Sequence, residues 1–335
     1  ATSSAFAAVR RDGSVVTWGL PERGGDSSTV QKRLRNVLHI QSTQCAFAAI
    51  LDDSSVVTWG SSNGGGDSSA VDAQLRDVHS IQSTQSAFAA ILRNGSVVTW
   101  GRQEAGGDSS AVQHRLKKVK DVQSTLHAFA AISEDGSVTT WGHANHGADS
   151  SAIEGRLNNV HQIQASSSAF AALLIDGSMV TWGDARAGGD SSSVQSKLRS
   201  VLQVQATQTS FAALLYDGSV VTWGQQRHGG DSSTVQDELR NVQQIQATTA
   251  AFAALLGDGS VVTWGSPGAG GDSSSRRPLL QGVTQIQASS TAFAALRRDG
   301  RVVTWGGLGY FSQDSQSETP AQLRHGYYIN QAQSV

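Results

Sequence analysis

One short motif constrains the fold of this chain more than any other feature. The stretch Ser14–Gly19 reads Ser-Val-Val-Thr-Trp-Gly, and it returns with small variations every 41 residues. A fixed period of this length indicates a repeat protein, in which each repeat folds as one unit that packs on its neighbours. The 335 residues are therefore expected to form one domain, residues 1–335. The motif contains all the tryptophans of the chain: Trp18, Trp59, Trp100, Trp141, Trp182, Trp223, Trp264 and Trp305.

A tight hairpin is predicted before every tryptophan. Ala5–Val9 is a short apolar run, and Val15–Trp18 alternates in the period-2 pattern of a strand. Between them lies Asp12-Gly13, a pair expected to supply the positive φ angles that hairpin turns need. Asp53-Ser54 is the exception to this pattern. The other repeats carry Asn94-Gly95, Asp135-Gly136, Asp176-Gly177, Asp217-Gly218, Asp258-Gly259 and Asp299-Gly300.

A short helix is predicted after the block Gly24–Ser28, which recurs in the other repeats. Ser28 and Gln31 resemble a capping box, and Val30, Leu34 and Val37 form one apolar stripe. About two turns of helix are expected. The same pairing recurs at Ser110/Gln113, Ser151/Glu154, Ser192/Gln195 and Ser233/Gln236. In the seventh repeat, Arg276-Arg277-Pro278 predicts a shorter or distorted helix.

A third strand is predicted over the Ile-Gln dipeptide of each repeat, as at Ile40-Gln41. Each repeat then holds three strands and one short helix, which is an all-β class. The chain begins halfway through a repeat, at residues 1–19, and residues 306–335 match the other half through Asp314, Leu323 and Tyr328–Gln331. These segments are expected to build one shared blade, closing an eight-bladed β-propeller.

The repeat Ala-Phe-Ala-Ala-Leu … Asp-Gly-Ser-Val-Val-Thr-Trp-Gly resembles the regulator-of-chromosome-condensation repeat. That family forms β-propellers, usually of seven longer blades, so the resemblance implies the same fold here. Its members include nucleotide exchange factors, chromatin binders, ubiquitin-ligase substrate modules and light sensors, in the cytoplasm or nucleus. The resemblance therefore implies a fold rather than one function. Guanine nucleotide exchange and chromatin binding are remote alternatives, because the even spacing leaves no blade with a large insertion.

Composition narrows the class of partner. Net charge is −2 and the sequence pI is about 6.5, which disfavours a nucleic-acid binder. No apolar run is long enough to span a membrane, so no membrane partner is expected. The chain is expected to be soluble and monomeric. No catalytic motif stands out, and no enzyme activity or cofactor is expected. The position of Cys45 holds Ser86, His127 or Thr209 in other repeats. We therefore interpret Cys45 as a substitution at a polar rim position rather than as a nucleophile.

Residues present in every repeat are interpreted as structural. The tryptophans are expected to pack between blades, with a chromophore or stacking ring as the alternative. One aspartate per repeat is expected to supply hydrogen bonds at the helix start, with cation binding as the alternative. His143, His146 and Asp149 have metal-like spacing, but surface histidines without a metal are the preferred interpretation. The repeated aspartates are Asp26, Asp67, Asp108, Asp149, Asp190, Asp231, Asp272 and Asp314.

The residues that vary between repeats are the candidate binding residues. Four positions after each Trp-Gly differ widely, and loops on a rigid scaffold commonly carry function. The leading hypothesis is a non-enzymatic scaffold that binds a protein partner through these loops or the mouth of the channel. The alternative is an engineered or recently amplified propeller without a dedicated ligand, since the repeats are nearly identical. The candidates are Glu22, Arg23, Arg102, Gln103, Glu104, His143, Asn145, His146, Asp184, Arg186, Gln226, Arg227 and His228.

Overall fold

The computed structural model of the chain describes residues 1–307. Within them the chain forms eight antiparallel sheets, of which seven have three strands and the first, β1–β2, has two. The helices of this part of the chain are short 3-10 turns. The all-β class and the eight blades of a β-propeller are therefore confirmed.

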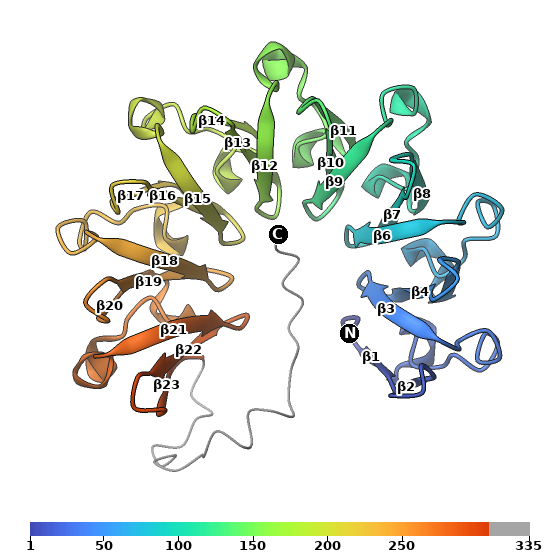
Figure 1. Cartoon of the computed structure of the whole chain (residues 1–335), viewed down its shortest axis with the longest axis horizontal. Coiled ribbons are helices and arrows are strands. Elements are labelled where there is room, and N and C mark those ends of the chain that lie inside the picture. Colours follow the sequence, from blue (N-terminus) through green and yellow to red (C-terminus); the bar gives the residue numbers. More distant parts are fainter. Residues whose placement is uncertain (308–335) are drawn as a thin grey trace. The chain divides into compact units, whose positions relative to one another are not determined.

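The chain divides into two bodies. The first body is Ala1–Ile175 with Val180–Ala185, and the second is Asp176–Met179 with Arg186–Val335. The first holds the sheets from β1 to β14, apart from the start of β14, and the second holds β15 to β23. Within the first body, successive sheets stand side by side with β3, β6, β9 and β12 at corresponding edges (Figure 1).

The elements of the first body follow the repeat. Its strands are β1 (Ala5–Val9), β2 (Val15–Gly19), β3 (Val37–Ser42), β4 (Ala46–Leu51), β5 (Val56–Gly60), β6 (Val78–Ser83), β7 (Ala87–Leu92), β8 (Val97–Gly101), β9 (Val119–Ser124), β10 (Ala128–Ser133), β11 (Val138–Gly142), β12 (Val160–Ala165), β13 (Ala169–Leu174) and β14 (Met179–Gly183). Its 3-10 turns are η1 (Pro21–Arg23), η2 (Ser62–Gly64), η3 (Gln103–Ala105), η4 (Ser110–Val112), η5 (Ala144–His146) and η6 (Ser151–Arg156).

The elements of the second body repeat the same order. Its strands are β15 (Val201–Ala206), β16 (Ser210–Leu215), β17 (Val220–Gly224), β18 (Val242–Ala247), β19 (Ala251–Leu256), β20 (Val261–Gly265), β21 (Val283–Ala288), β22 (Ala292–Arg297) and β23 (Val302–Gly306). Its 3-10 turns are η8 (Gln195–Lys197), η9 (Gln226–His228), η10 (Pro267–Ala269) and η11 (Ser274–Leu279), and η7 (Ala185–Ala187) joins the two bodies.

The predicted hairpins are confirmed, with one correction to the turn. Val9 pairs with Val15 across the first hairpin, and only Gly13 within it has a positive φ, of 75°. Asp12 instead accepts hydrogen bonds from the N–H and Oγ of Ser14. This is a three-residue turn that ends in a left-handed glycine, rather than a two-residue turn with two positive φ angles. A Cβ on Gly13 would lie 2.7 Å from the Cα of Asn36 in the next repeat. This close approach is a second reason why position 13 requires glycine.

The exceptional turn at Ser54 gives a testable prediction. Ser54 has a φ of 62°, a conformation that strains a residue with a Cβ. Ser54→Gly is expected to raise the free energy of unfolding by about 1 kcal/mol, net of the extra entropy of glycine in the unfolded chain. Chemical denaturation measures the change. The reciprocal variant, Gly136→Ser at a φ of 77°, should lower stability, and equal stabilities of the three proteins would contradict the explanation.

The predicted helix is wrong in length and in its cap. Between the Gly-Gly block and the next strand the chain forms turns, with a short 3-10 turn in four repeats (η4, η6, η8 and η11), and Val37 begins β3 instead of lying on a helix. The N–H of Ser28 donates to the carboxylate of Asp26. Ser28 and Gln31 therefore do not form the predicted capping box. Gln31 accepts from Ser27 Oγ and donates through Nε2 to the carbonyl of Val15, so its side chain ties the segment to the preceding hairpin. In the seventh repeat, η11 spans six residues with Pro278 inside it, so it is not shorter than its equivalents.

The core of each complete blade is an aromatic pair covered by the preceding repeat. Phe47 and Trp59 stack with ring centroids 5.1 Å apart and are 0% and 3% exposed. Trp59 Nε1 donates to the carbonyl of Gly24 at 3.0 Å, which lies 35 residues earlier in the preceding repeat. The same bond is made by Trp100, Trp141, Trp182, Trp223, Trp264 and Trp305.

The first sheet lacks this cover among the described residues. Phe6 and Trp18 also stack, with centroids 5.3 Å apart, yet they are 50% and 49% exposed. The sheet β1–β2 also has one strand fewer than the others. The predicted shared blade needs residues 306–335, and residues 308–335 lie outside the described part of the chain, so this expectation stays a prediction.

Hydrogen bonds also join successive blades at the turns that precede their middle strands β4, β7 and β10, here called the inner turns. In the first body the N–H of Gln44 donates to the carbonyl of Gln85, whose own N–H donates to the carbonyl of Leu126. Nearby, Gln41 Nε2 donates to Ser83 Oγ, and Ser83 Oγ donates to the carbonyl of Ser42. Such bonds satisfy backbone and side-chain groups that the blade contact removes from water.

One link of this kind is missing in the second body. Gln205 occupies the place of Gln41, is 7% exposed, and has no hydrogen-bond partner for its side-chain nitrogen among the described residues. The place of Ser83 is held by Ala247, which has no hydroxyl. A buried amide without a partner costs about 1–3 kcal/mol.

Ala247→Ser is expected to restore the missing link. The new Oγ would accept from Gln205 Nε2, and we expect about 1 kcal/mol of added stability. Ala165→Ser is the matched control, because the equivalent Gln123 already donates to Asp121. Thermal unfolding of both variants checks this, and equal effects in the two would argue against the orphaned amide as the cause.

Candidate functional site

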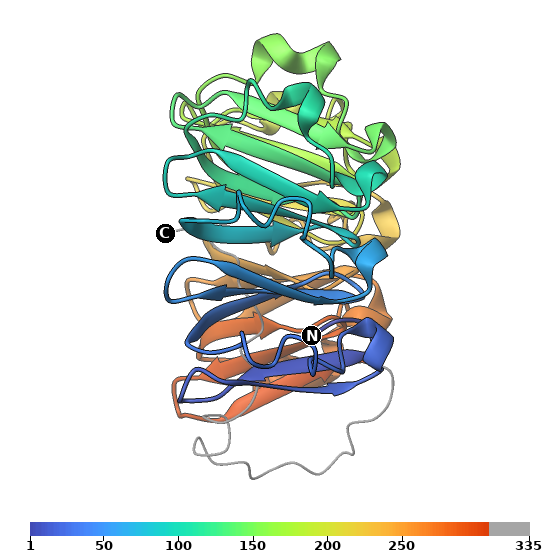
Figure 2. The same ribbon diagram turned by 90° about the vertical axis from the view of Figure 1, so that its right-hand side faces the viewer.

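The variable residues after each Trp-Gly lie at one end of the strands. Ala46 pairs with Gly60, so the segment after Gly60 starts beside the inner turn that precedes β4. The Asp-Gly hairpins lie at the opposite end, since Ile50 pairs with Val56 there. In the side view, several short helical turns of the first body lie along its right-hand side, and others lie at its top edge (Figure 2).

The variable segments, which were predicted to be loops, are copies of one 3-10 turn. The copies of this turn are η1, η2, η3, η5, η7, η9 and η10. Each has three residues and is followed by a glycine with a φ between 88° and 95°. A Cβ on the first such glycine, Gly24, would lie 2.6 Å from the Phe47 ring. The turn is therefore fixed by the aromatic core beneath it, while its own side chains are free to differ.

The candidate binding residues lie on these turns or, as for Arg102, His143 and Asp184, immediately before them. Arg23 is half-buried and donates to Ser3 Oγ, whereas Glu22 beside it is exposed. Arg102 pairs with Glu104 at 2.9 Å, so these two charges are already matched. The remaining exposed candidates are Gln103, His143, Asn145 and Asp184 in the first body and Arg186, Gln226 and Arg227 in the second, where His228 is half-buried.

Three histidines gather on this face of the first body, and the sequence pattern had identified only two of them. The His146 ring lies 4.6 Å from that of His127 and 5.2 Å from that of His143, both edge to face. Asp149 is not part of the group; its carboxylate accepts from the N–H and Oγ of Ser151. Burial lowers the pKa of His127, and the nearby His146, His143 and Arg102 lower it further.

The register of the blade explains why His127 belongs to the group. Ala128 pairs with Gly142, which sets the residue before β10 beside the residue after β11. In the other repeats the place of His127 is held by Ser4, Cys45, Ser86, Ser168, Thr209, Ala250 or Thr291. A pairing argument of this kind identifies His127, whereas the spacing of histidines along the chain does not.

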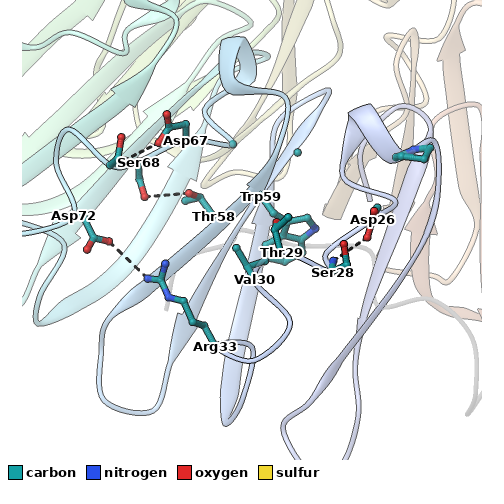
Figure 3. Close-up of a pocket in the computed structure, with 14 residues that line it drawn as sticks. Asp26, Ser28, Thr29, Val30, Arg33, Thr58, Trp59, Asp67, Ser68 and Asp72 are labelled. Atoms are coloured by element: carbon teal, nitrogen blue, oxygen red, sulfur yellow. Dashed lines mark hydrogen bonds and ion pairs between the residues drawn. The ribbon is translucent and has the colours of Figure 1, made fainter.

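A second candidate site is a groove of about 530 Å³ between adjacent blades of the first body (Figure 3). It is lined by the Asp26 and Asp67 segments, with Trp59 at its base and the Arg33–Asp72 ion pair across it. No sequence pattern had predicted this groove. An equivalent groove of about 470 Å³ in the second body is lined by Asp231, Asp272 and Trp264.

Equivalent ion pairs link neighbouring segments in several repeats, and the positions of the positive and negative residues are exchanged in one of them. Arg33 pairs with Asp72, and at the same repeat positions Arg115 pairs with Glu154 at 2.8 Å. In the second body Glu238 pairs with Arg277, with the charges exchanged. The position of Asp72 holds Gln31 in another repeat, where the side chain bonds within its own segment. These surface pairs therefore substitute for one another as links between neighbouring segments.

The repeated aspartates already have partners. Asp26 accepts from the N–H of Ser28, and this bond, with one to the Ser28 side chain, lowers the pKa of Asp26. Asp67, Asp108, Asp190, Asp231 and Asp272 have their pKa lowered in the same way, and Asp314 lies outside the described residues. Among residues 1–307, no group of three His, Cys, Asp or Glu is placed to hold a metal ion. Cys45 is half-buried beneath Gly64.

Comparison with solved structures finds β-propeller relatives at low identity. Prp20p of Saccharomyces cerevisiae matches at 13% identity over 79% of this chain and 81% of that chain, with a TM-score of 0.46. Yeast RCC1 (Prp20) in its complex with Kap60 matches at 17% identity over 94% and 83%, with a TM-score of 0.48. The computationally designed protein Ika8 matches at 13% identity over 90% and 93%, with a TM-score of 0.36.

RCC1 is thus among the structures to which this chain is similar, as the repeat motif predicted. No protein-family model and no curated protein matches the chain. Identities and TM-scores this low carry no argument about function, and the fold is established by the blades themselves. Within residues 1–307, none of the helices has the length and hydropathy of a membrane span.

Proposed function

We propose that this chain is a non-enzymatic scaffold that binds a protein partner through the turns after its Trp-Gly motifs. The observation that carries the proposal is that one backbone conformation presents different side chains at every copy. Pro-Glu-Arg, Gln-Glu-Ala, Ala-Asn-His and Gln-Arg-His all occupy the same 3-10 turn. The conformation is fixed by packing, so variation there changes the surface without changing the blade.

A fixed turn suits binding because its side chains lose little backbone entropy on association. Each turn begins in an extended residue and ends in a left-handed glycine packed on the aromatic core, as Leu20 and Gly24 do around η1. By contrast, the polar groups that line the groove of Figure 3 already bond to one another, as Thr58 does with Ser68. Part of the polar lining of the groove is therefore already satisfied within the chain.

Affinity capture from a native lysate of the source cells tests the proposal. The full chain is compared with a variant in which Glu22, Gln103, Glu104, Asn145, Gln226 and Arg227 are all replaced by serine. We expect the full chain to retain a stoichiometric partner and the serine variant to lose it.

The control variant carries serine at Arg11, Glu134 and Tyr216, which are exposed at the opposite end of the strands. It should retain the partner, and melting curves confirm that all the proteins fold. A partner retained by the variant of the turns would move the site elsewhere. No stoichiometric partner at all would favour the alternative of a symmetric propeller without a dedicated ligand, which the near-identity of the repeats supports.

A further inference from the structure

One variable turn of the second body holds a histidine that is hydrogen-bonded from one side. His228 ends η9, the 3-10 turn after β17, and its ring is half-buried. Nδ1 of His228 lies 2.7 Å from Oγ1 of Thr209, the residue before β16 of the same blade. Gln225 begins the turn, and its backbone N–H donates to the carbonyl of Thr209. The backbone therefore brings the three side chains together beyond the ends of β16 and β17.

The direction of the hydrogen bonds follows from the number of protons on these side chains. Oγ1 of Thr209 also lies 3.0 Å from Oε1 of Gln225 and donates to it, since an amide oxygen carries no proton. A threonine hydroxyl has one proton, so it cannot also donate to the imidazole. It accepts there instead, and the proton of the 2.7 Å contact lies on Nδ1 of His228.

This assignment leaves a hydrogen-bond acceptor on the other side of the ring. A neutral imidazole with its proton on Nδ1 has a lone pair on Nε2. Nε2 of His228 makes no hydrogen bond within residues 1–307 and is not buried by them. A histidine without such contacts carries its proton mainly on Nε2, and the bond made by one ring nitrogen decides the state of the other. Thr209 and Gln225 thus turn an acceptor outward where a free histidine would present a donor.

The histidine at the same place of a first-body turn is held differently. Nδ1 of His146 lies 2.8 Å from Oγ of Ser168 on the next blade, and the residue before its own middle strand is His127, which has no hydroxyl. For His228 the place of Ser168 is taken by Ala250, so the next blade offers no hydroxyl. The bond to the same blade, and with it the outward acceptor, therefore depends on residues that vary between repeats.

We propose that His228 is a recognition residue, held with its proton on Nδ1, whose Nε2 accepts a hydrogen bond from an N–H or O–H group of a protein partner. This inference rests on the proposed function, because it assigns a chemistry to one of the variable turns. A carboxylate of the partner does not fit against the neutral ring, since two acceptors would face each other without a proton. An acceptor that is left unpaired when it is buried weakens binding, so this turn selects partners with a donor at that point.

Nitrogen NMR of the full chain with isotope-labelled histidine tests the position of the proton without any partner. The spectrum is recorded at about pH 8, where an imidazole is neutral, and His228→Gln assigns the His228 signals. We expect Nδ1 to be the protonated nitrogen in the full chain and in Thr209→Ser, which keeps a hydroxyl. In Thr209→Val, which has none, the proton should move to Nε2. His161 is an exposed histidine on β12 and serves as the reference with its proton on Nε2.

Gln225→Leu tests the other end of the hydrogen-bonded chain. The equivalent place before η1 is held by Leu20 in the same extended conformation, so the turn tolerates leucine there. Without Oε1 of Gln225, the Thr209 hydroxyl can donate to Nδ1, and we expect the proton of His228 on Nε2. A proton on Nε2 in the full chain would overturn the inference. So would a proton that stays on Nδ1 in both Thr209→Val and Gln225→Leu.

The recognition step is tested with the purified partner that the turns capture. His228→Phe removes the acceptor, and we expect the loss of one hydrogen bond to weaken binding about tenfold. His228→Gln keeps an amide oxygen that can accept, so binding should weaken by less than about threefold. Melting curves confirm that both variants fold.

Unchanged affinity in His228→Phe would overturn this inference and leave the proposed function standing. A partner retained by the serine variant of the turns, or no partner at all, would overturn the proposed function and the recognition step with it, whatever the position of the proton.

Discussion

Gly106→Ala is expected to lower the free energy of unfolding by about 3–5 kcal/mol. Gly106 has a φ of 94°, and a Cβ there would lie 2.6 Å and 2.8 Å from two ring carbons of Phe129. The left-handed conformation costs a residue with a Cβ about 1–3 kcal/mol, and overpacking a buried ring adds about 1–3 kcal/mol more. The carbonyl of Gly106 also accepts from Trp141 Nε1, so any shift of this segment strains that bond as well.

Gly155→Ala is the matched control for this prediction. Gly155 lies in η6 of the same body, and a Cβ there meets no atom within 4 Å. Its replacement should change stability by less than about 1 kcal/mol. Denaturant unfolding of the two variants gives the comparison. Similar losses in both would show that the Gly-Gly block is not held by the ring of the next blade.

Trp141→Ala is expected to destabilise by about 3–5 kcal/mol. Trp141 is 4% exposed and stacks on Phe129 with centroids 5.2 Å apart. Its removal opens a cavity at the contact between two blades and leaves the Gly106 carbonyl without its donor. Trp141→Phe keeps an aromatic ring but not the N–H, so we expect a smaller loss of about 1–2 kcal/mol.

Leu126→Ala serves as the comparison for the tryptophan variants, because Leu126 is 36% exposed at the neighbouring inner turn. It should cost less than about 1 kcal/mol. Thermal melting with a denaturant series ranks the three variants. An unchanged melting temperature for Trp141→Ala would refute a packing role and would favour the alternative of a stacking or chromophore ring.

The strands were predictable because each depends on a pattern of nearest neighbours. Alternation in Val15–Trp18 and the turn at Gly13 specify the hairpin without help from the rest of the chain. The helix was not predictable in the same way. Leu34 is fully buried, Asn36 is left-handed and Val37 already pairs in β3, so too few residues remain for two helical turns.

The candidate site was predictable only in part, for a related reason. The variable positions after Trp-Gly are visible in the repeat, but their shared 3-10 conformation depends on Gly24 packing against a ring of the next repeat. Strand register places His127 beside His146. Two repeats together form the groove over Trp59. Contacts between two repeats cannot be recognised from the sequence of either repeat alone.

The central structural proposal is that residues 306–335 share a blade with residues 1–19. It is motivated by the exposed pair Phe6 and Trp18, whose equivalents in all other blades are buried beneath the preceding repeat. A segment that supplied the same cover to the first sheet would protect Trp18 from solvent. Trp18 is therefore the residue whose environment reports on the proposal.

The most direct test is fluorine NMR of the protein labelled with fluorotryptophan, with a soluble paramagnetic agent added. Trp18→Phe assigns the Trp18 resonance. In the full chain, Trp18 is expected to be as protected from the agent as the other seven tryptophans, and removal of residues 308–335 should expose it while the others stay protected. A Trp18 signal that is broadened in the full chain as strongly as in the shortened one would contradict the shared blade.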